Sequence, residues 1–511
     1  MKTSKGVPFA RPFKDTCLSV AISLVLSGCA VGPDFKSPDA PSAASDDSYT
    51  PTALPEQTAA ADGAAGVAQR FAFGQDIPAQ WWTLFHSEAL DQMIRSALQQ
   101  SPNMAAAQAA LRQAQENLNA ESGNLLYPNV SGQLSAERQR ASAVSTGIPG
   151  GSVFNLFNAS VNVSYTLDVF GASRRTLEGL QAVVDYQRFQ VEATYLALTA
   201  NLVTTAIKEA SLRAQLLATQ QVLAAQQQQL AVIEKQFALG AIPRFTLLTQ
   251  RTQVAQTLAS LPALEKSLAQ TRHQLSVYAG KLPSESGMPE FQLDSLQLPQ
   301  DLPVTLPSAL VRQRPDIRAN EELLHQASAQ IGVATANQYP QITLSGAYGS
   351  AALRMGDLFT HAAGFWSIAA ALAQPIFNGG ALSAKRRAAV AAYDQAEAQY
   401  RATVLTAFQN VADSLRALDS DASTLKAQVE VEAVAQEALT LITRQYALGA
   451  VSYLALLDAE RSYQQSRIGL VQAQAARYAD TAALFQALGG GWWNRQSPTD
   501  AAPTATAEPN N

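Results

Sequence analysis

The chain has 511 residues, carries a formal net charge of −5 at pH 7, and contains only 15% charged residues. Ordinary soluble proteins contain about 25% charged residues, so the long helical segments described below favour close packing over a highly charged surface. The small negative charge gives no basic footprint for nucleic acid.

The first thirty residues have the pattern of an export signal. Four basic residues, Lys2, Lys5, Arg11 and Lys14, precede a short apolar stretch, residues 17–26. Leu26-Ser27-Gly28-Cys29 ends it. This tetrapeptide resembles the bacterial lipobox, which predicts removal of residues 1–28 and acylation of Cys29. Several acyl chains anchor a protein stably where one does not. A plain secretory signal with an incidental cysteine is the alternative. Alanine rather than aspartate at position 30 favours the outer membrane by the rule for these signals.

The next segment, residues 29–80, is predicted to be an extended arm. Its composition is rich in Ala, Ser, Pro and Asp and shows little periodicity, so we expect it to tether the folded body to lipid. Beyond the signal, no apolar run reaches the ~18–20 residues of a membrane-spanning helix, and 364–377 is the nearest. A membrane crossing would therefore have to be a β-barrel.

Four strands are predicted from alternating side chains. Val161, Val163, Tyr165 and Leu167 share one face, and Asn162, Ser164, Thr166 and Asp168 share the other. This alternation is typical of a transmembrane strand, although a half-buried strand of a soluble sandwich would alternate identically. We expect 130–138 to pair with this strand, and 342–348 to pair with 366–372 in a second copy. Four strands leave two open edges, which cannot face lipid, so three chains giving twelve strands is the simplest closed solution.

One pattern occurs twice, 209 residues apart. Gln236 to Ala241 and Gln445 to Ala450 both contain a Leu-Gly pair between two long helical patterns. Gly240 and Gly449 would supply the left-handed residue that ends a helix, and Pro243 or Ser452 would begin the returning helix. Each copy is therefore predicted to be the tip of a long antiparallel helical hairpin.

Heptad repeats on both sides of the tips predict coiled-coil packing. The first hairpin has Leu216, Leu223, Leu230 and Phe237, then Leu247, Val254, Leu261, Leu268 and Leu275. The second has Leu418, Leu425, Leu439 and Tyr446, then Leu456, Tyr463, Leu470 and Leu484, with interruptions at Glu432 and Arg477. An ordinary amphipathic core helix is the alternative for any single run. The first long helix should cover 172–239, or ~100 Å at 1.5 Å per residue, a length suited to a conduit through the periplasm.

The repeats define the domain organisation. The first repeat is predicted at 81–281, a proline-punctuated linker at 282–307, the second repeat at 308–488, and a polar tail at 489–511. Arg174 and Arg175 follow a predicted strand, where they would contact lipid headgroups or form a solvated face.

Together these features resemble the TolC-like outer-membrane efflux factors, in particular their NodT-type lipoprotein branch. The matching segments are Cys29 with Val31 to Phe35, Trp81-Trp82, the two Tyr-Pro strand beginnings, Thr271 to Leu275, and both Leu-Gly tips. The resemblance implies a membrane β-barrel joined to an all-α periplasmic barrel, built by a homotrimer with twelve strands and twelve tunnel helices. It also implies a lipid-anchored protein of the outer membrane that works with a periplasmic adaptor and an inner-membrane pump.

The resemblance further implies roles for particular residues. The tips that contact the adaptor would be Leu239, Gly240 and Ala241, and Leu448, Gly449 and Ala450. Asp458 matches a carboxylate that lines the periplasmic gate, with an exterior solvated carboxylate as the alternative. Tyr446 matches a tyrosine that helps to hold the closed state. Thr246 and Val451 replace the charged partners of that lock, and Ala455 lies where a second acidic ring can occur, so Tyr446 would instead pack in the seam.

Three functions are compatible with these predictions. The first is a passive duct for small toxic compounds, the second a duct for secreted polypeptides, and the third a structural coiled-coil lipoprotein without a pore. An enzyme is the weakest hypothesis, because the four histidines are scattered and the mature chain would have no free cysteine. We expect no cofactor and no metal.

Overall fold

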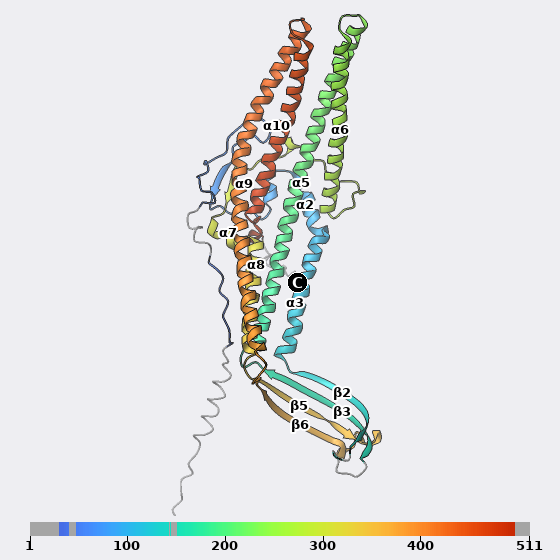
Figure 1. Cartoon of the computed structure of the whole chain (residues 1–511), viewed down its shortest axis with the longest axis vertical. Coiled ribbons are helices and arrows are strands. Elements are labelled where there is room, and N and C mark those ends of the chain that lie inside the picture. The colour runs from blue at the N-terminus through green and yellow to red at the C-terminus, as the bar shows by residue number, and fades with distance from the viewer. Residues whose placement is uncertain (1–29, 40–47, 143, 145–150, 496–511) are drawn as a thin grey trace, which may run out of the picture. The chain divides into compact units, whose positions relative to one another are not determined.

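The computed structural model describes residues 30–39, 48–142, 144 and 151–495 (Figure 1). The predicted signal peptide, Cys29 and the end of the polar tail lie outside the described residues. The chain divides into two compact units that we describe separately. The first unit comprises Met1–Pro38, Ala110–Gln187 and Asn320–Tyr400, and the second comprises Asp39–Ala109, Arg188–Ala319 and Arg401–Asn511.

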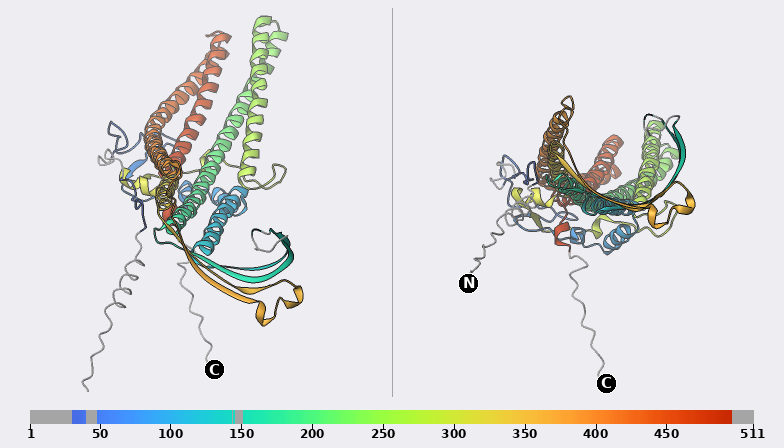
Figure 2. Two further views of the ribbon diagram at one scale, coloured as in Figure 1. Left: turned by 60° about the horizontal axis from the view of Figure 1, so that its bottom comes forward. Right: turned by 90° about the horizontal axis from the view of Figure 1, so that it is seen from below.

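The first unit contains a four-stranded antiparallel sheet (Figure 2). Its strands are β2 (Asn129–Ala141), β3 (Ser152–Leu167), β5 (Gln341–Ala352) and β6 (Gly364–Ala373). The order is β2-β3-β5-β6, so each predicted hairpin forms and the two copies join through β3 and β5. Among the described residues, β2 and β6 each pair on one side only, and both edges of the sheet are open.

The predicted alternation continues across the whole sheet. Residues that lie directly opposite in an antiparallel pair point to the same face. Val161 lies opposite Tyr348, which lies opposite Trp366. In the neighbouring row, Val163 and Ile368 flank Gly346. Trp366 is 74% exposed and Ile368 83% exposed, so a face of apolar side chains is uncovered by the described part of this chain.

Four long helices confirm the two-copy organisation. They are α5 (Ala172–Ala238), α6 (Arg244–Tyr278), α9 (Ala381–Ala447) and α10 (Tyr453–Ala487). Helices α5 and α9 have 67 residues each, and α6 and α10 have 35 each. The shorter helices are α2 (Glu88–Gln100), α3 (Pro102–Leu126), α7 (Pro307–Gln313) and α8 (Pro315–Ala336). Among the described residues, no helix combines the length and apolar composition that crossing a membrane requires.

Eight of the seventeen heptad positions are buried in the helical hairpins, eight are half-buried, and Phe237 is 38% exposed. Buried members are Leu223, Leu247, Leu261, Leu275, Leu418, Leu425, Leu456 and Leu484. The two interruptions of the repeat have different explanations. Glu432 pairs with Arg467 at 3.6 Å, whereas Arg477 is fully buried and binds the N-terminal arm.

Part of the predicted arm, residues 58–69, packs into the second unit, which its composition did not predict. Arg477 donates hydrogen bonds from Nη1 to the Ala65 carbonyl (2.7 Å) and the Val67 carbonyl (3.2 Å). Its Nη2 donates to Thr58 Oγ1 (3.1 Å) and Gln69 Oε1 (2.8 Å). The two Nη atoms thus have four acceptors, whereas Nε has no hydrogen-bond partner among the described residues. A buried charge is tolerated only when it is hydrogen-bonded, and these four bonds supply that stabilisation. Residues 58–69 are therefore part of the second unit.

A small parallel sheet joins the arm to the predicted linker. Strand β1 (Arg70–Phe73) pairs in register with β4 (Asp301–Val304). No periodicity predicts this pairing, because both strands are only four residues long. The adjoining η2 turn (Trp81–Phe85) buries Trp81, which packs against Phe485 with ring centroids 5.4 Å apart. The tryptophan pair that opens the first repeat is thus a core element of the second unit.

Candidate functional site

The tips of the helical hairpins have the predicted glycine caps. Gly240 has φ +71° and Gly449 has φ +73°, a backbone region that other residues rarely adopt. The Ala241 amide donates to the Gln236 carbonyl at 2.9 Å, and the Ala450 amide donates to the Gln445 carbonyl at 2.9 Å. This bond closes a helix end in a Schellman motif. The two tips therefore have the same backbone geometry.

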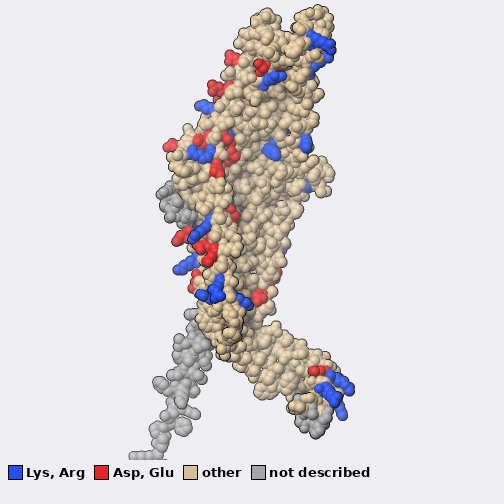
Figure 3. Space-filling model, in the orientation of Figure 1, with Lys and Arg blue, Asp and Glu red and all other residues tan. Residues whose placement is uncertain are grey.

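Each tip presents apolar side chains to solvent at equivalent positions. Leu239 and Leu448 are both 84% exposed. Phe245 and Leu454, at the start of the returning helices, are also exposed. Figure 3 shows few charged side chains over the helices on this face, with basic groups at the end of the α5–α6 hairpin. Exposed leucines on rigid turns are suited to bind an apolar partner surface.

Tyr446 packs in the seam of the second hairpin. Its ring lies 5.7 Å from the ring of Tyr453 on α10, tilted by 55°. Burial raises the pKa of Tyr446. The Tyr453 hydroxyl donates to Gln250 Oε1 on α6, which connects the second hairpin to the first.

Buried glutamines extend this connection between the hairpins. Gln250 Nε2 donates to the Gln226 carbonyl on α5 at 2.9 Å, and Arg461 Nε donates to Gln253 Oε1 at 2.8 Å. Sequence reasoning missed these residues because glutamine is common on helix surfaces. Gln250 lies three residues after the heptad position Leu247. A heptad has two core positions that are three residues apart, so this spacing could have predicted that Gln250 is buried.

A cavity of about 280 Å³ lies between α5, α9 and α10 in the second unit. Its polar lining includes Gln226, Glu460 and Arg467. Among the described residues, the Gln226 side-chain amide and Glu460 Oε2 have no hydrogen-bond partner. A cavity of this size with several polar side chains in its lining can hold water molecules. Burial raises the pKa of Glu460 to about 7, so this carboxyl group titrates near neutral pH.

Replacing Glu460 by glutamine is expected to make the thermal stability of the protein less dependent on pH. Because the folded-state pKa is raised, the burial penalty is absent below the ordinary pKa near 4.5, grows with pH, and is complete above about 7. The wild-type protein should therefore lose more thermal stability than Glu460→Gln between about pH 5 and about pH 8. Thermal unfolding at several pH values measures the difference, with the exposed Glu437→Gln as control. Superimposable pH profiles for wild type and Glu460→Gln would show that the cavity does not act through this carboxyl group.

The remaining predicted residues are placed as follows. Asp458 is exposed on α10, two residues before Glu460. Cys29 lies outside the described residues, and its neighbours in sequence are considered below. The structure shows no group of three or more His, Cys, Asp or Glu side chains that could hold a metal ion, within its described ranges.

Comparison with known proteins defines the class. Residues 93–281 and 306–490 match the family model described as outer membrane efflux protein. The chain therefore belongs to the outer membrane efflux protein family, whose members are channel and transport proteins. The first matched segment contains β2, β3 and the α5–α6 hairpin, and the second contains β5, β6 and the α9–α10 hairpin.

Particular relatives and solved structures agree with this membership. The chain is 29% identical over 485 residues to the toluene efflux pump outer membrane protein TtgC of Pseudomonas putida, covering 94% of this chain and 96% of the relative. It is 29% identical over 500 residues to nodulation protein T of Rhizobium leguminosarum bv. viciae, covering 96% and 97%. The solved outer-membrane channel OprN is 26% identical with a TM-score of 0.80, covering 91% of this chain and all of that chain.

Proposed function

We propose that this chain is the outer-membrane channel subunit of a tripartite efflux system and exports small toxic compounds passively. The observation that carries the proposal is a sheet with an uncovered apolar face and two open edges, in a chain that also has two long helical hairpins. Membership of a family of outer-membrane channels supports the same function. Energy for export would come from an inner-membrane pump.

The open edges support a homotrimer. Unpaired backbone groups cannot face lipid, so β2 and β6 need partner strands. Three copies of this sheet would close into a barrel of twelve strands, with Trp366 and Ile368 among the side chains that face lipid. The four long helices of each chain would together supply the twelve helices of a periplasmic tunnel.

Two further features support the assignment of partners. Acylation of Cys29 would anchor the protein in the outer membrane through lipid. The exposed tips at Leu239 to Ala241 and Leu448 to Ala450 would contact the helical hairpins of a periplasmic adaptor. The name of the Pseudomonas putida relative concerns toluene, which agrees with a small apolar cargo rather than a polypeptide.

Replacing Asp458 by alanine tests its proposed role in the periplasmic gate. Three copies of this exposed carboxylate around one axis would repel one another and attract cations. We expect Asp458→Ala to raise ion conductance or to weaken block by divalent cations in planar bilayers. The exposed Glu437→Gln on α9 serves as the control. If conductance and block both stay at wild-type values, Asp458 does not line the gate.

Co-purification from cross-linked membranes tests the proposed function as a whole. We expect an affinity-tagged full-length protein to recover a periplasmic adaptor and an inner-membrane pump, and both should be identifiable by mass spectrometry. Deletion of the gene for this chain should raise sensitivity to small compounds that the recovered pump expels. Recovery of neither protein, with unchanged sensitivity, would contradict a role in efflux.

A further inference from the structure

Residues 31–37 pack within the first unit, beside the turn between β3 and α5. The Val31 amide donates to the Phe170 carbonyl at 3.1 Å. Two glycines make a close approach possible. A Cβ on Gly32 would lie 2.5 Å from the Gly332 Cα on α8, and a Cβ on Gly171 would lie 2.6 Å from the Ala30 Cα. Backbone contact this close requires glycine, so the segment has a defined position rather than a general affinity for the surface.

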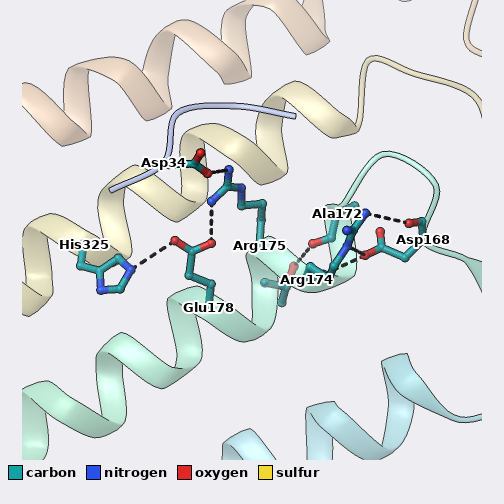
Figure 4. A network of polar contacts seen from close by, with 8 residues as sticks. Asp34, Asp168, Ala172, Arg174, Arg175, Glu178 and His325 are labelled. Carbon is teal, nitrogen blue, oxygen red and sulfur yellow. Dashed lines mark hydrogen bonds and ion pairs between the residues drawn. The ribbon is translucent and has the colours of Figure 1, made fainter. Parts of the chain in front are cut away.

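Arg175 fixes the segment by charge (Figure 4). Its Nη2 donates to Asp34 Oδ1 at 2.6 Å, and its Nη1 donates to Glu178 Oε2 at 2.7 Å. The side chain of Arg175 is buried and crosses α8 at Gly332, where a Cβ would lie 2.7 Å from Arg175 Cγ. Arg175 is thus available neither to lipid headgroups nor to bulk solvent, so both expectations for the Arg174-Arg175 pair are wrong for this residue. Arg174 instead pairs with Asp168 at 3.3 Å.

His325 on α8 holds the next residue of the segment. The Phe35 ring stacks on the His325 ring with centroids 4.4 Å apart and planes 13° apart. The two ring nitrogens of His325 lie 3.2 Å from Glu178 Oε1 and 3.3 Å from Glu322 Oε2. The two carboxylates raise the pKa of His325, chiefly through the contact with Glu322. Ser37 donates to Glu321 Oε1 one turn earlier on α8.

We propose that Arg175, His325 and Gly332 form a docking site for residues 31–37, which holds the acylated N-terminus at the junction between the sheet and the helices. The proposal rests on the acylation of Cys29 proposed above. Two residues of extended chain span at most about 7 Å, so residue 29 must stay within that distance of docked Val31. The acyl chains would then enter the membrane beside the end of β3, at the level where the apolar sheet face begins.

Docking depends on several contacts together rather than on one ion pair. The Asp34 side chain is 89% exposed, and exposed ion pairs are weakened by solvent and salt. The stacked Phe35 ring and the Val31 backbone bond are the other contributions. A combined Asp34→Asn and Phe35→Ala variant removes the charge and the stacking while leaving the helices and the sheet unaltered. Lys36→Gln, at the exposed position directly after Phe35, is the matched control.

Hydrogen–deuterium exchange of the full-length protein in lipid nanodiscs tests the docking site. We expect the Val31 amide, which donates to the Phe170 carbonyl, to be protected in wild type and in Lys36→Gln, and to exchange at least tenfold faster in the double variant. Gly332→Leu should cause the same loss of protection, because the leucine side chain would occupy the space in which Gly32 lies against α8. Rapid exchange of the wild-type segment, or equal protection in the double variant, would overturn the proposal.

The mass of the N-terminal peptide separates this proposal from the acylation that it builds on. Acyl chains on Cys29 in every variant, with protection lost only in the docking variants, is the expected result. An unacylated peptide whose segment is still protected would refute the lipid anchor and leave the docking contacts intact. An acylated peptide with an unprotected segment would refute the docking site and leave the anchor.

Discussion

Replacing Arg477 by alanine is expected to lower the free energy of unfolding of the second unit by about 3–5 kcal/mol. The substitution removes four hydrogen bonds from one buried guanidinium and leaves the carbonyls of Ala65 and Val67 without their donor. It also leaves the side chains of Thr58 and Gln69 short of a partner inside the unit. Buried polar groups that lose their partner carry the full cost of desolvation.

Denaturant unfolding followed by tryptophan fluorescence, to which the buried Trp81 and Trp82 contribute, measures this effect. Arg467→Ala on the same helix is the matched control, because its pair with Glu432 is partly exposed and should contribute less than about 1 kcal/mol. Proteolysis should also cut the arm faster in Arg477→Ala, since residues 58–69 lose their anchor. If Arg477→Ala were no less stable than Arg467→Ala, the arm would not be held by this guanidinium.

Replacing both Leu239 and Leu448 by aspartate is expected to weaken adaptor binding by at least about 100-fold. Each leucine is 84% exposed in the free chain, and burying such a side chain in a partner contributes about 1.5–3 kcal/mol. Aspartate removes that contribution and adds a charge that must lose its hydration on binding. The glycine caps at 240 and 449 remain, so the turns should keep their backbone geometry.

Binding of the purified adaptor to the channel in nanodiscs measures this effect. Leu282→Asp is the matched control, because Leu282 is equally an exposed leucine but lies outside the hairpins. The double variant should retain the oligomeric state and ion conductance of the wild type. Full affinity in the double variant would show that the adaptor binds elsewhere on the chain.

Much of this fold could be predicted because its signals are local and periodic. Gly240 and Gly449 mark the helix ends through backbone conformation alone, which depends on the residue itself. The alternation from Val161 to Leu167 fixes which side chains share a face, and any strand that pairs with it extends the same face. Patterns of this kind can be recognised from neighbouring residues alone, without knowledge of which distant segments they contact.

The remaining features depend on contacts between distant segments, and local pattern carries little information about them. Strand β1 pairs with β4 more than two hundred residues later. The raised pKa of Glu460 depends on its burial against α5, and its own sequence neighbourhood is that of a surface residue. Arg477 did carry a signal in the sequence, because it occupies a heptad position where an apolar residue was expected. Such an interruption indicates a buried polar contact but does not identify the partner.

The position of Arg175 illustrates the same limit. In sequence it is one of two adjacent arginines after a strand, and both alternatives considered for it placed it in lipid headgroups or solvent. Its burial follows from Gly332 on α8 and from the docked segment with Asp34. Neither partner is near it in the chain. A charged residue can therefore be assigned to a buried site only when the segments that surround it are known.

The subunit count of the acylated protein in lipid nanodiscs, determined by native mass spectrometry with electron microscopy of the same sample, tests the central claim most directly. Our account predicts three copies whose sheets close into one continuous barrel around a single pore. A stable single chain with both β2 and β6 still unpaired in lipid would contradict it.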